Sequence, residues 1–182
     1  MQHVAHSPAQ RAYARALVDL TRAIDPTRPV ISNDGWEHVD SDILSVHDYE
    51  WRPEVVRQRY AGPDAAERLV AGLGPAGRRM VVDERQRLDA PLMLTEFGGI
   101  RFTPGGAAED AWGYSVATSA DDFRERLAGL LEAVHDSDVL AGFCYTQLTD
   151  TLQEANGLLT EDRAPKLPMP VLRAIITGRR EE

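Results

Sequence analysis

A glutamate stands where an apolar strand gives way to two glycines, and this feature constrains the fold of the chain most. The run Pro91-Leu92-Met93-Leu94 precedes Thr95-Glu96-Phe97-Gly98-Gly99. A short continuous apolar run is typical of a parallel-sheet strand buried on both faces. The glycine pair permits a sharp turn and leaves room for a ligand beside the carboxylate. Glu96 is therefore predicted at a strand end, either as a functional carboxylate or as a solvated turn residue.

Size and charge narrow the class of protein. The 182 residues, 43% of them hydrophobic, are enough for one domain with a full core. The 29 acidic and 20 basic residues give a net charge of −9, which disfavours a nucleic-acid partner or an anionic membrane surface. Because no apolar stretch reaches about 18 residues and no signal-like segment opens the chain, we expect a cytoplasmic protein that does not enter a membrane. The single cysteine, Cys144, lies in an apolar run and is predicted to be a buried free thiol.

Helical and strand patterns alternate along the chain. Ser7-Pro8-Ala9-Gln10 has the form of a capping box, and a helix is expected from there to about Ile24. Its apolar residues fall on one face: Tyr13, Ala16, Leu17, Leu20 and Ile24. Strands are expected at residues 28–33, 42–49, 91–98 and 139–146, with two short helical pieces between residues 51 and 90.

The second half of the chain carries a clear helix signal. Ser119 is expected to cap a helix whose apolar stripe belongs to the core: Phe123, Leu127, Leu130, Leu131 and Val134. A last short helix is expected at residues 170–176. The glycine-rich segment of residues 98–119 carries Trp112 and Tyr114, and a loop of more than about 15 residues with aromatic side chains is more often functional than idle.

Alternating strands and helices predict an α/β fold with a parallel sheet covered by helices. Four β/α units are half of the eight that close a (β/α)8 TIM barrel, whose usual length is about 250 residues. Residues 1–182 are therefore predicted to form one domain, a partial barrel.

Polar side chains gather at the predicted carboxyl ends of the four strands. In a parallel α/β sheet these ends share one rim, so residues far apart in sequence converge there. Carboxylates, amides and hydroxyls beside aromatic faces suit a carbohydrate. Besides Glu96, the candidate site residues are Asn33, Asp34, Trp36, His47, Asp48, Tyr49, Trp112, Tyr145, Gln147 and Asp150.

Each candidate also has a purely structural interpretation. Residues 33–35 are equally well a turn, and His47 is equally well a core histidine held by a backbone carbonyl. Tyr49 and Tyr145 are equally well aromatic residues at the rim that contact no ligand. Trp36 and Trp112 are equally well residues that cap the end of the barrel. His3 and His6 have no cysteine or carboxylate to complete a metal site, and no phosphate loop or dinucleotide fingerprint is present. We therefore predict no metal and no cofactor.

Four segments together resemble the C-terminal half of the catalytic barrel in glycoside hydrolase family 2, the β-galactosidase, β-mannosidase and β-glucuronidase group. In order along the chain they are Asp25-Pro26-Thr27-Arg28-Pro29-Val30, His47-Asp48-Tyr49, Pro91-Leu92-Met93-Leu94-Thr95-Glu96-Phe97-Gly98 and Gly157-Leu158-Leu159-Thr160-Glu161-Asp162-Arg163-Ala164-Pro165-Lys166. The resemblance implies the last four β/α units of the barrel, with the N-terminal half and the β-sandwich domains absent.

The resemblance also implies a chemistry. Glu96 corresponds to the catalytic nucleophile of a retaining β-glycosidase, and Tyr49 to a tyrosine that hydrogen-bonds it. The family takes its acid/base glutamate from an Asn-Glu pair, and no such dipeptide occurs in this sequence. The chain is therefore expected to be inactive or very weak alone, because loss of general acid help costs about 10²- to 10⁴-fold.

The same resemblance also implies a substrate class and partners. β-Glucuronidases of the family carry an Asn-x-Lys pair where this chain has Glu154 and Asn156, so a neutral β-glycoside, with a β-galactoside first, fits better. The expected partners are a carbohydrate and either the missing barrel half or a second copy. The alternative is a non-catalytic sugar-binding or structural half-barrel that associates through its open sheet edges.

Overall fold

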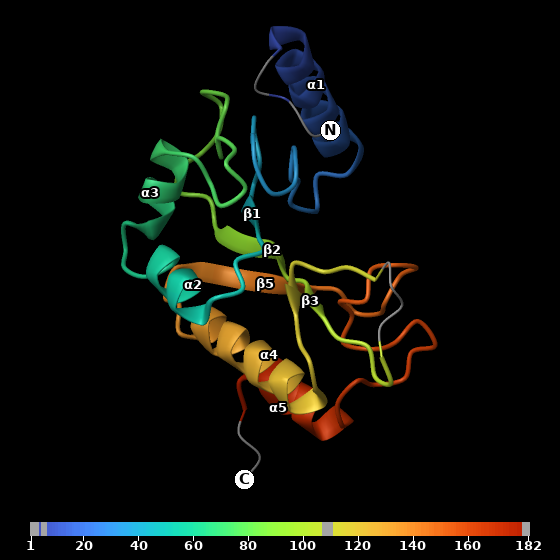
Figure 1. Cartoon of the computed structure of the whole chain (residues 1–182). Helices are drawn as coiled ribbons and strands as arrows, with labels where there is room; N and C mark the ends of the chain where they lie inside the picture. The colour runs from blue at the N-terminus through green and yellow to red at the C-terminus, as the bar shows by residue number, and fades with distance from the viewer. Residues whose placement is uncertain (1–3, 5–6, 107–110, 180–182) are drawn as a thin grey trace. The chain divides into compact units, whose positions relative to one another are not determined.

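A computed structural model of the chain describes residue 4, residues 7–106 and residues 111–179, so the predictions on His3 and His6 lie outside the described residues. The chain forms two compact units (Figure 1). The first unit comprises Met1–Asp48, Ala61–Glu96 and Asp138–Cys144, and the second comprises Tyr49–Tyr60, Phe97–Ser137 and Tyr145–Glu182.

The predicted helices are present, as are the strands predicted at residues 42–49, 91–98 and 139–146. In chain order the helices and strands are α1 (Pro8–Ile24), β1 (Leu44–Asp48), α2 (Pro53–Arg59), α3 (Ala65–Ala71), β2 (Leu92–Gly98), β3 (Ile100–Arg101), β4 (Ser115–Val116), α4 (Ala120–His135), β5 (Leu140–Thr146) and α5 (Met169–Thr177). No helix in the described part of the chain is long and apolar enough to cross a membrane.

The main sheet is parallel and has the strand order β1-β2-β5. The predicted α/β class with a parallel sheet is thus confirmed. Within the described residues the three strands do not close into a barrel, and β1 and β5 form the two edges. A second, two-stranded sheet pairs β3 with β4 in parallel, with Ile100 opposite Ser115.

The strand predicted at residues 28–33 is wrong. This segment is an irregular loop whose backbone amides are bonded by side chains of the residues that follow. The Val30 amide donates to Asp42 Oδ2 at 2.7 Å, and the Ser32 amide donates to Ser41 Oγ at 2.9 Å. Because side-chain oxygens satisfy these amides, the segment does not need a neighbouring strand.

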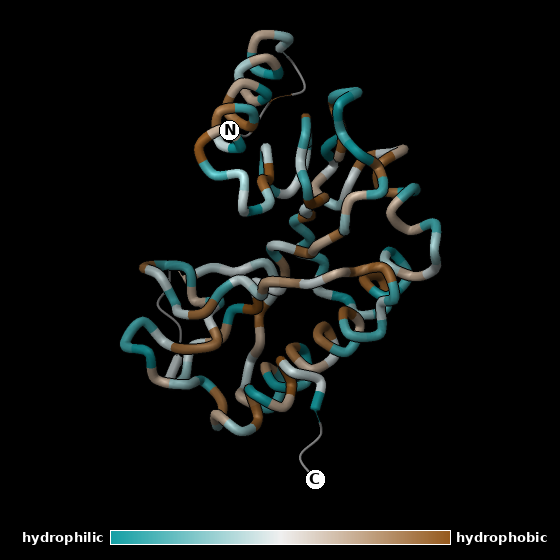
Figure 2. Tube along the Cα trace, turned by 180° about the vertical axis from the view of Figure 1, so that it is seen from behind, coloured by the Kyte–Doolittle hydropathy of each residue, from teal (hydrophilic) through white to brown (hydrophobic). Residues whose placement is uncertain are grey.

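Helix α1 is held to the first unit by ion pairs and a narrow apolar contact. Ser7 caps its start, as predicted, by accepting a hydrogen bond from the Gln10 amide. Only Ala14 and Val18 are buried, whereas Arg15 pairs with the buried Asp83. The predicted apolar face is exposed in the chain: Tyr13, Leu17, Leu20 and Ile24. Figure 2 shows brown, hydrophobic positions beside teal, hydrophilic ones along this helix.

The core of the second unit is built on α4. Ser119 caps the helix by accepting from the Asp122 amide at 3.1 Å. The predicted apolar stripe is buried throughout, and Phe123 stacks on Phe102 at 5.3 Å between ring centroids. Helix α2 packs on α4 at Gly129, where a Cβ atom would lie 3.0 Å from Pro53.

The prediction that Cys144 is buried is wrong, because this thiol is exposed. The residue lies on β5, an edge strand whose side chains are intermediate or exposed along its whole length. Its apolar run resembled a strand covered on both faces, whereas neither face of β5 is fully covered in this chain.

Candidate functional site

The predicted site residues divide between the two units. The first unit carries Asn33, Asp34, Trp36, His47, Asp48 and Glu96, and the second carries Tyr49, Trp112, Tyr145, Gln147 and Asp150. Each unit therefore carries a polar cluster of its own.

In the first unit, the His47 side chain lies between two carboxylates. Its Nδ1 atom is 3.1 Å from Glu96 Oε2, and its Nε2 atom is 3.1 Å from Asp34 Oδ2. The imidazole is 13% exposed, whereas Asp34 and Glu96 are 50% and 39% exposed. A nearly buried ring thus joins two carboxylates that solvent or a ligand can reach.

A tight turn between residues 33 and 36 brings Asp34 to His47. Asn33 Nδ2 donates to the Trp36 carbonyl at 2.7 Å, so Asn33 holds the turn. Gly35 has a φ of +88°, and its amide donates to Ser45 Oγ at 2.9 Å. A Cβ atom on Gly35 would lie 2.5 Å from His47 Cγ, so only glycine leaves room for the ring.

Asp34 is held in its ionised form. Burial opposes ionisation, but contacts with His47, Ser45 and Thr95 outweigh that effect and lower the pKa of Asp34 well below its usual value of 3.8. The Thr95 hydroxyl donates to Asp34 Oδ1 at 2.7 Å. Asp34 is therefore a hydrogen-bond acceptor at neutral pH and cannot supply a proton.

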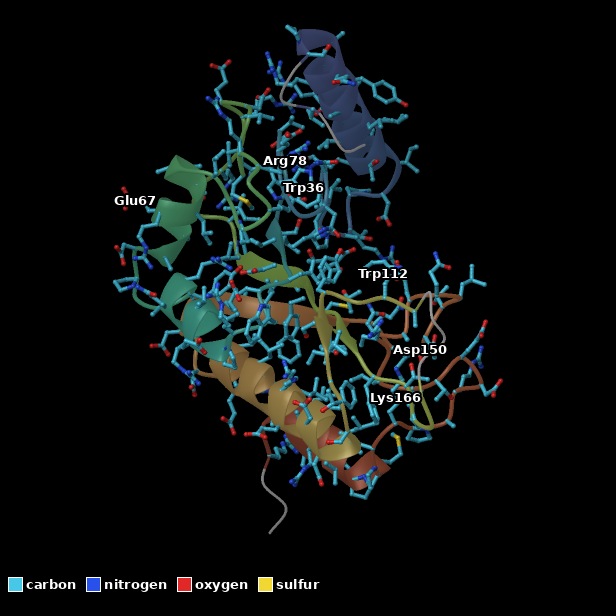
Figure 3. All side chains as sticks on the ribbon, viewed as in Figure 1. Trp36, Glu67, Arg78, Trp112, Asp150 and Lys166 are labelled. Atoms are coloured by element: carbon cyan, nitrogen blue, oxygen red, sulfur yellow. The ribbon has the colours of Figure 1, made fainter. Side chains whose placement is uncertain are left out.

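Trp36 supports the imidazole from the side. The two rings meet edge to face, with centroids 5.1 Å apart and an interplanar angle of 74°. The guanidinium of Arg78 lies over the Trp36 ring, 5.6 Å from its centroid, and Arg78 also pairs with the buried Glu37 at 3.0 Å. Figure 3 shows the labelled Trp36 and Arg78 side chains next to each other.

Sequence reasoning missed four residues around this cluster: His38, Ser45, Arg78 and Thr95. One signal was present for Ser45, because residues two apart on a strand share a face and Ser45 precedes His47 by two. His38 is a structural histidine, since its ring bonds Ser41 Oγ and the Ser45 carbonyl. Burial lowers its pKa and keeps the ring neutral.

Asp34, His47 and Glu96 also meet the distance condition for a cation site. One ligand atom of each lies within 4.8 Å of the other two. However, each ring nitrogen of His47 lies 3.1 Å from a carboxylate oxygen, so both nitrogens already face an acceptor within the cluster. The contacts among these three side chains account for the cluster without a metal.

In the second unit, three aromatic side chains form a row. The Tyr49 and Tyr114 rings stack 3.6 Å apart with an angle of 11°, and Trp112 meets Tyr114 edge to face at 5.5 Å. A Cβ atom on Gly99 would lie 2.5 Å from the Tyr114 ring, so the glycine after Gly98 makes room for this row. Such a row offers ring faces of the kind that sugars stack on.

The polar residues of the second unit are mostly paired with one another. Lys166 Nζ donates to Asp150 Oδ1 at 2.7 Å, and the Gly157 amide donates to the same oxygen at 2.8 Å (Figure 3). Gln147 Nε2 donates to Asn156 Oδ1 at 2.7 Å. Asp150 and Gln147 were predicted to bind substrate, and in this structure their contacts are internal.

Two further candidates are Asp48, which is buried, and Tyr145, whose hydroxyl oxygen is buried. Asp48 is 2% exposed at the end of β1. The Tyr145 ring packs against Phe97, and burial raises the pKa of its phenol far above the usual range. The hydroxyl of Tyr145 remains neutral at any pH at which the protein would work.

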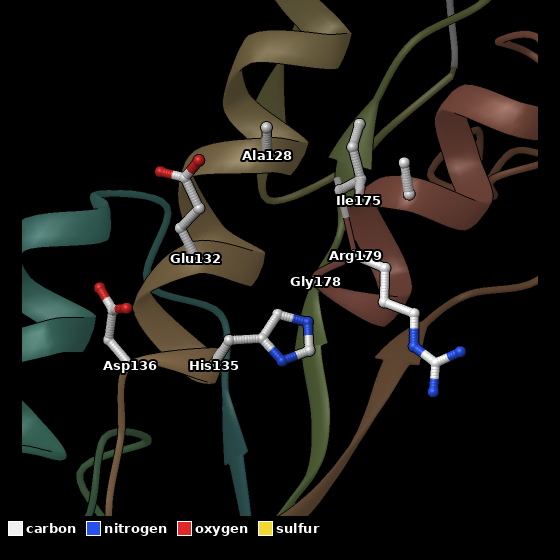
Figure 4. Close-up of a pocket in the computed structure, with 8 residues that line it drawn as sticks. Ala128, Glu132, His135, Asp136, Ile175, Gly178 and Arg179 are labelled. Atoms are coloured by element: carbon white, nitrogen blue, oxygen red, sulfur yellow. The ribbon is translucent and has the colours of Figure 1, made fainter. Parts of the chain in front are cut away.

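A pocket of about 520 Å³ lies between α4 and α5 in the second unit (Figure 4). Glu132, His135, Asp136 and Arg179 are among its lining residues, and His135 Nε2 lies 3.1 Å from the Ile176 carbonyl oxygen. None of the predicted site residues lines this pocket.

No protein-family profile matches the sequence, and no curated protein matches it. Solved structures do match. A GH2 β-galacturonidase from Eisenbergiella tayi aligns with a TM-score of 0.61 at 15% identity, over 96% of this chain and 31% of that one. A β-glucuronidase from Faecalibacterium prausnitzii aligns with a TM-score of 0.57 at 19% identity, over 98% of this chain and 30% of that one. The chain is related in structure to GH2 glycoside hydrolases.

The likeness establishes a fold and its extent. An exo-β-agarase also aligns, with a TM-score of 0.59 at 17% identity, over 93% of this chain and 23% of that one. The chain thus spans less than a third of each of these proteins. The structural likeness to GH2 proteins is confirmed, whereas the assignment to the last four β/α units of a barrel and the roles of individual residues stay predictions.

Proposed function

We propose that this chain is part of a retaining β-glycosidase in which Glu96 is the nucleophile. The observation that carries the proposal is the position of Glu96: it lies on β2, is partly exposed, and is contacted by His47 at 3.1 Å in a fold that matches GH2 enzymes. In a retaining mechanism such a carboxylate attacks the anomeric carbon while a second carboxyl group, about 5 to 5.5 Å away, protonates the leaving oxygen.

The second carboxyl group is not Asp34. Asp34 is the other carboxylate of the cluster, but its lowered pKa leaves it without the proton that a general acid must donate. The acid/base is therefore proposed to be the family's Asn-Glu glutamate, supplied by a barrel half other than the one in this sequence.

Tyr49 is proposed to hydrogen-bond Glu96 and favour its ionised form. This role rests on the family resemblance of His47-Asp48-Tyr49. The stack of Tyr49 on Tyr114 is compatible with it, because stacking occupies the ring face and leaves the phenol edge to donate.

A neutral sugar remains the proposed substrate, with a β-galactoside first. The proteins named above act on uronic acids or agar, but the likeness extends to the fold alone. The β-glucuronidases of the family carry a lysine where this chain has Asn156, and Lys166 is the only lysine of the chain. Its ammonium group is fully buried and donates to Asp150 and to the Ala155 carbonyl, so it is shielded from a sugar carboxylate.

Trapping of the nucleophile tests the proposal. A 2-deoxy-2-fluoro-β-glycoside with a dinitrophenolate leaving group needs no general acid, so it should label Glu96 in the 182-residue chain combined with an Asn-Glu barrel half. Peptide mapping should place the label on Glu96, and Glu96→Gln should abolish it. Glu154→Gln is the matched control and should label normally. A label that persists in Glu96→Gln, or that maps to Glu50 or Glu154, would refute the assignment.

A second candidate function is a non-catalytic half-barrel that associates with another copy. The exposed apolar face of α1 and the two sheet edges favour it. Sedimentation of the purified chain should then show dimers or larger species, and Leu20→Lys should shift them towards monomer. Leu88→Lys, a change at an exposed leucine outside α1, is the control. A stable monomer that hydrolyses unactivated β-galactosides would contradict both candidates.

A further inference from the structure

The contact between His47 and Glu96 is positioned from several sides. Gly35 leaves space for the imidazole, where a Cβ atom would come within 2.5 Å of it. Trp36 meets the ring edge to face, and Asp34 lies 3.1 Å from the nitrogen farther from Glu96. A side chain that is confined in this way offers its other nitrogen in one fixed direction.

The two nitrogens of His47 are not equivalent. Nδ1 lies at hydrogen-bond distance from Glu96, whereas Nε2 approaches Asp34 at a similar distance without good hydrogen-bond alignment. A ring nitrogen can donate to the carboxylate that it faces only if it carries a proton. The geometry therefore favours the proton on Nδ1, directed at Glu96.

Asp34 is itself fixed by two hydroxyl groups. Thr95 donates to Oδ1, and the hydrogen bond from Ser45 also contributes to its ionisation. Thr95 directly precedes Glu96 on β2, and Ser45 precedes His47 by two positions on β1. Residues of the neighbouring strands β1 and β2 thus fix Glu96, the His47 ring and Asp34 in one arrangement.

We propose that His47 is a positioning residue for Glu96: its Nδ1–H group orients the carboxylate oxygen that attacks the anomeric carbon, and Gly35 and Trp36 confine the ring in that direction. The proposal rests on the proposed function of Glu96. His47 exchanges no proton with the substrate, so the C–O bond forms at Glu96 and the aglycone oxygen takes its proton from the separate acid/base. Orientation of this kind commonly contributes about 10- to 100-fold.

Two substitutions separate the nitrogens. An asparagine amide nitrogen lies about where Nδ1 of histidine lies, and a glutamine amide nitrogen lies about where Nε2 lies. His47→Asn therefore keeps a donor towards Glu96, and His47→Gln keeps one towards Asp34. The assay is the labelling of Glu96 by the dinitrophenyl 2-fluoroglycoside, with the maximal rate and the half-saturating concentration measured separately.

His47→Gln should lower the maximal labelling rate about 10- to 100-fold with little change in half-saturation, and His47→Asn should restore most of that rate. His135→Gln, in the second unit, is the matched control and should label normally. If Glu96 is labelled in the parent chain and the Asn and Gln variants are equal, the positioning role is refuted while the nucleophile stands. If Glu96 is not labelled in the parent chain combined with the Asn-Glu barrel half, the proposed function itself fails.

A spectroscopic readout tests the same geometry without substrate. Long-range ¹H–¹⁵N spectra of the 182-residue chain should show a protonated Nδ1 on His47 at neutral pH, assigned by its loss in His47→Gln. A His47 ring that carries its only proton on Nε2 would overturn the proposal, even if Glu96 proves to be the nucleophile.

Discussion

The two polar clusters of this protein differ in how their charges are compensated. In the second unit, Asp150 shares one oxygen with a buried ammonium group and a backbone amide. In the first unit, Asp34 and Glu96 share a single imidazole and stay partly exposed. The arrangement around Asp150 directs its hydrogen bonds to groups inside the protein. The arrangement around His47 leaves the oxygens of Asp34 and Glu96 partly exposed to a ligand. This exposure distinguishes a candidate active site from a structural ion pair.

The same difference explains which site predictions gain support. Asp150, Gln147 and Asp34 share one sequence feature: each is a polar residue at a predicted strand end. Only Asp34 lies in a cluster that includes a partly exposed second carboxylate. Polar residues at strand ends therefore include internally paired residues as well as candidate site residues. The partners of each residue decide whether its charge is available for chemistry.

The largest expected effect on the free energy of unfolding concerns Lys166 and tests the buried ion pair of the second unit. Lys166→Met would leave the Asp150 carboxylate buried without its cation, and breaking a buried ion pair on one side costs about 3 to 5 kcal/mol. Urea unfolding of the 182-residue chain should show the loss, and the double variant Lys166→Met with Asp150→Asn should recover part of it. A loss below about 1 kcal/mol would mean that the pair behaves like a surface salt bridge.

An intermediate effect is expected at Gly35. Gly35→Ala adds a Cβ atom into the His47 ring at a position with φ of +88°, so overpacking and backbone strain together should cost about 2 to 3 kcal/mol. Gly77→Ala is a matched control in the same unit, because its φ is +69° and no atom lies within 4 Å of the added carbon. It should cost only about 1 kcal/mol of backbone strain.

The labelling assay makes the Gly35 test specific. Gly35→Ala should slow labelling of Glu96, because the displaced ring no longer orients the carboxylate, and Gly77→Ala should not. Equal unfolding free energies and equal labelling rates for the two variants would show that His47 is not confined by Gly35.

The smallest effect is expected at Thr95. The folded chain lowers the pKa of Asp34 below 3.8, so this group stabilises the fold above that pH and the contribution is lost as pH falls through the folded-state value. Thr95→Val removes one hydroxyl donor and should move the loss to higher pH. The difference in unfolding free energy between Thr95→Val and the parent chain, followed from pH 5 downwards, should be largest near pH 5 and shrink as Asp34 takes up its proton. A difference that does not change with pH would exclude Asp34 as the group through which Thr95 acts.

Local sequence patterns determined much of this protein. The Ser7 and Ser119 caps, the buried stripe of α4 and the apolar run of β2 that leads to Glu96 all follow from spacing within one element. Such patterns depend on contacts between near neighbours in sequence, so they can be read without the fold. Local patterns fail where the outcome depends on contacts with distant segments. Cys144 is exposed because β5 is an edge strand. Residues 28–33 form no strand because side chains satisfy their backbone amides.

Only the tertiary structure decided which polar residues meet. His47 lies between Asp34 and Glu96 because a turn with a glycine at positive φ and two neighbouring strands bring three distant segments together. The pairing of Lys166 with Asp150 likewise depends on the chain returning to the end of β5. Sequence spacing reports which face of an element a side chain occupies. The partner of that side chain, and hence its charge and its chemistry, is set by long-range packing.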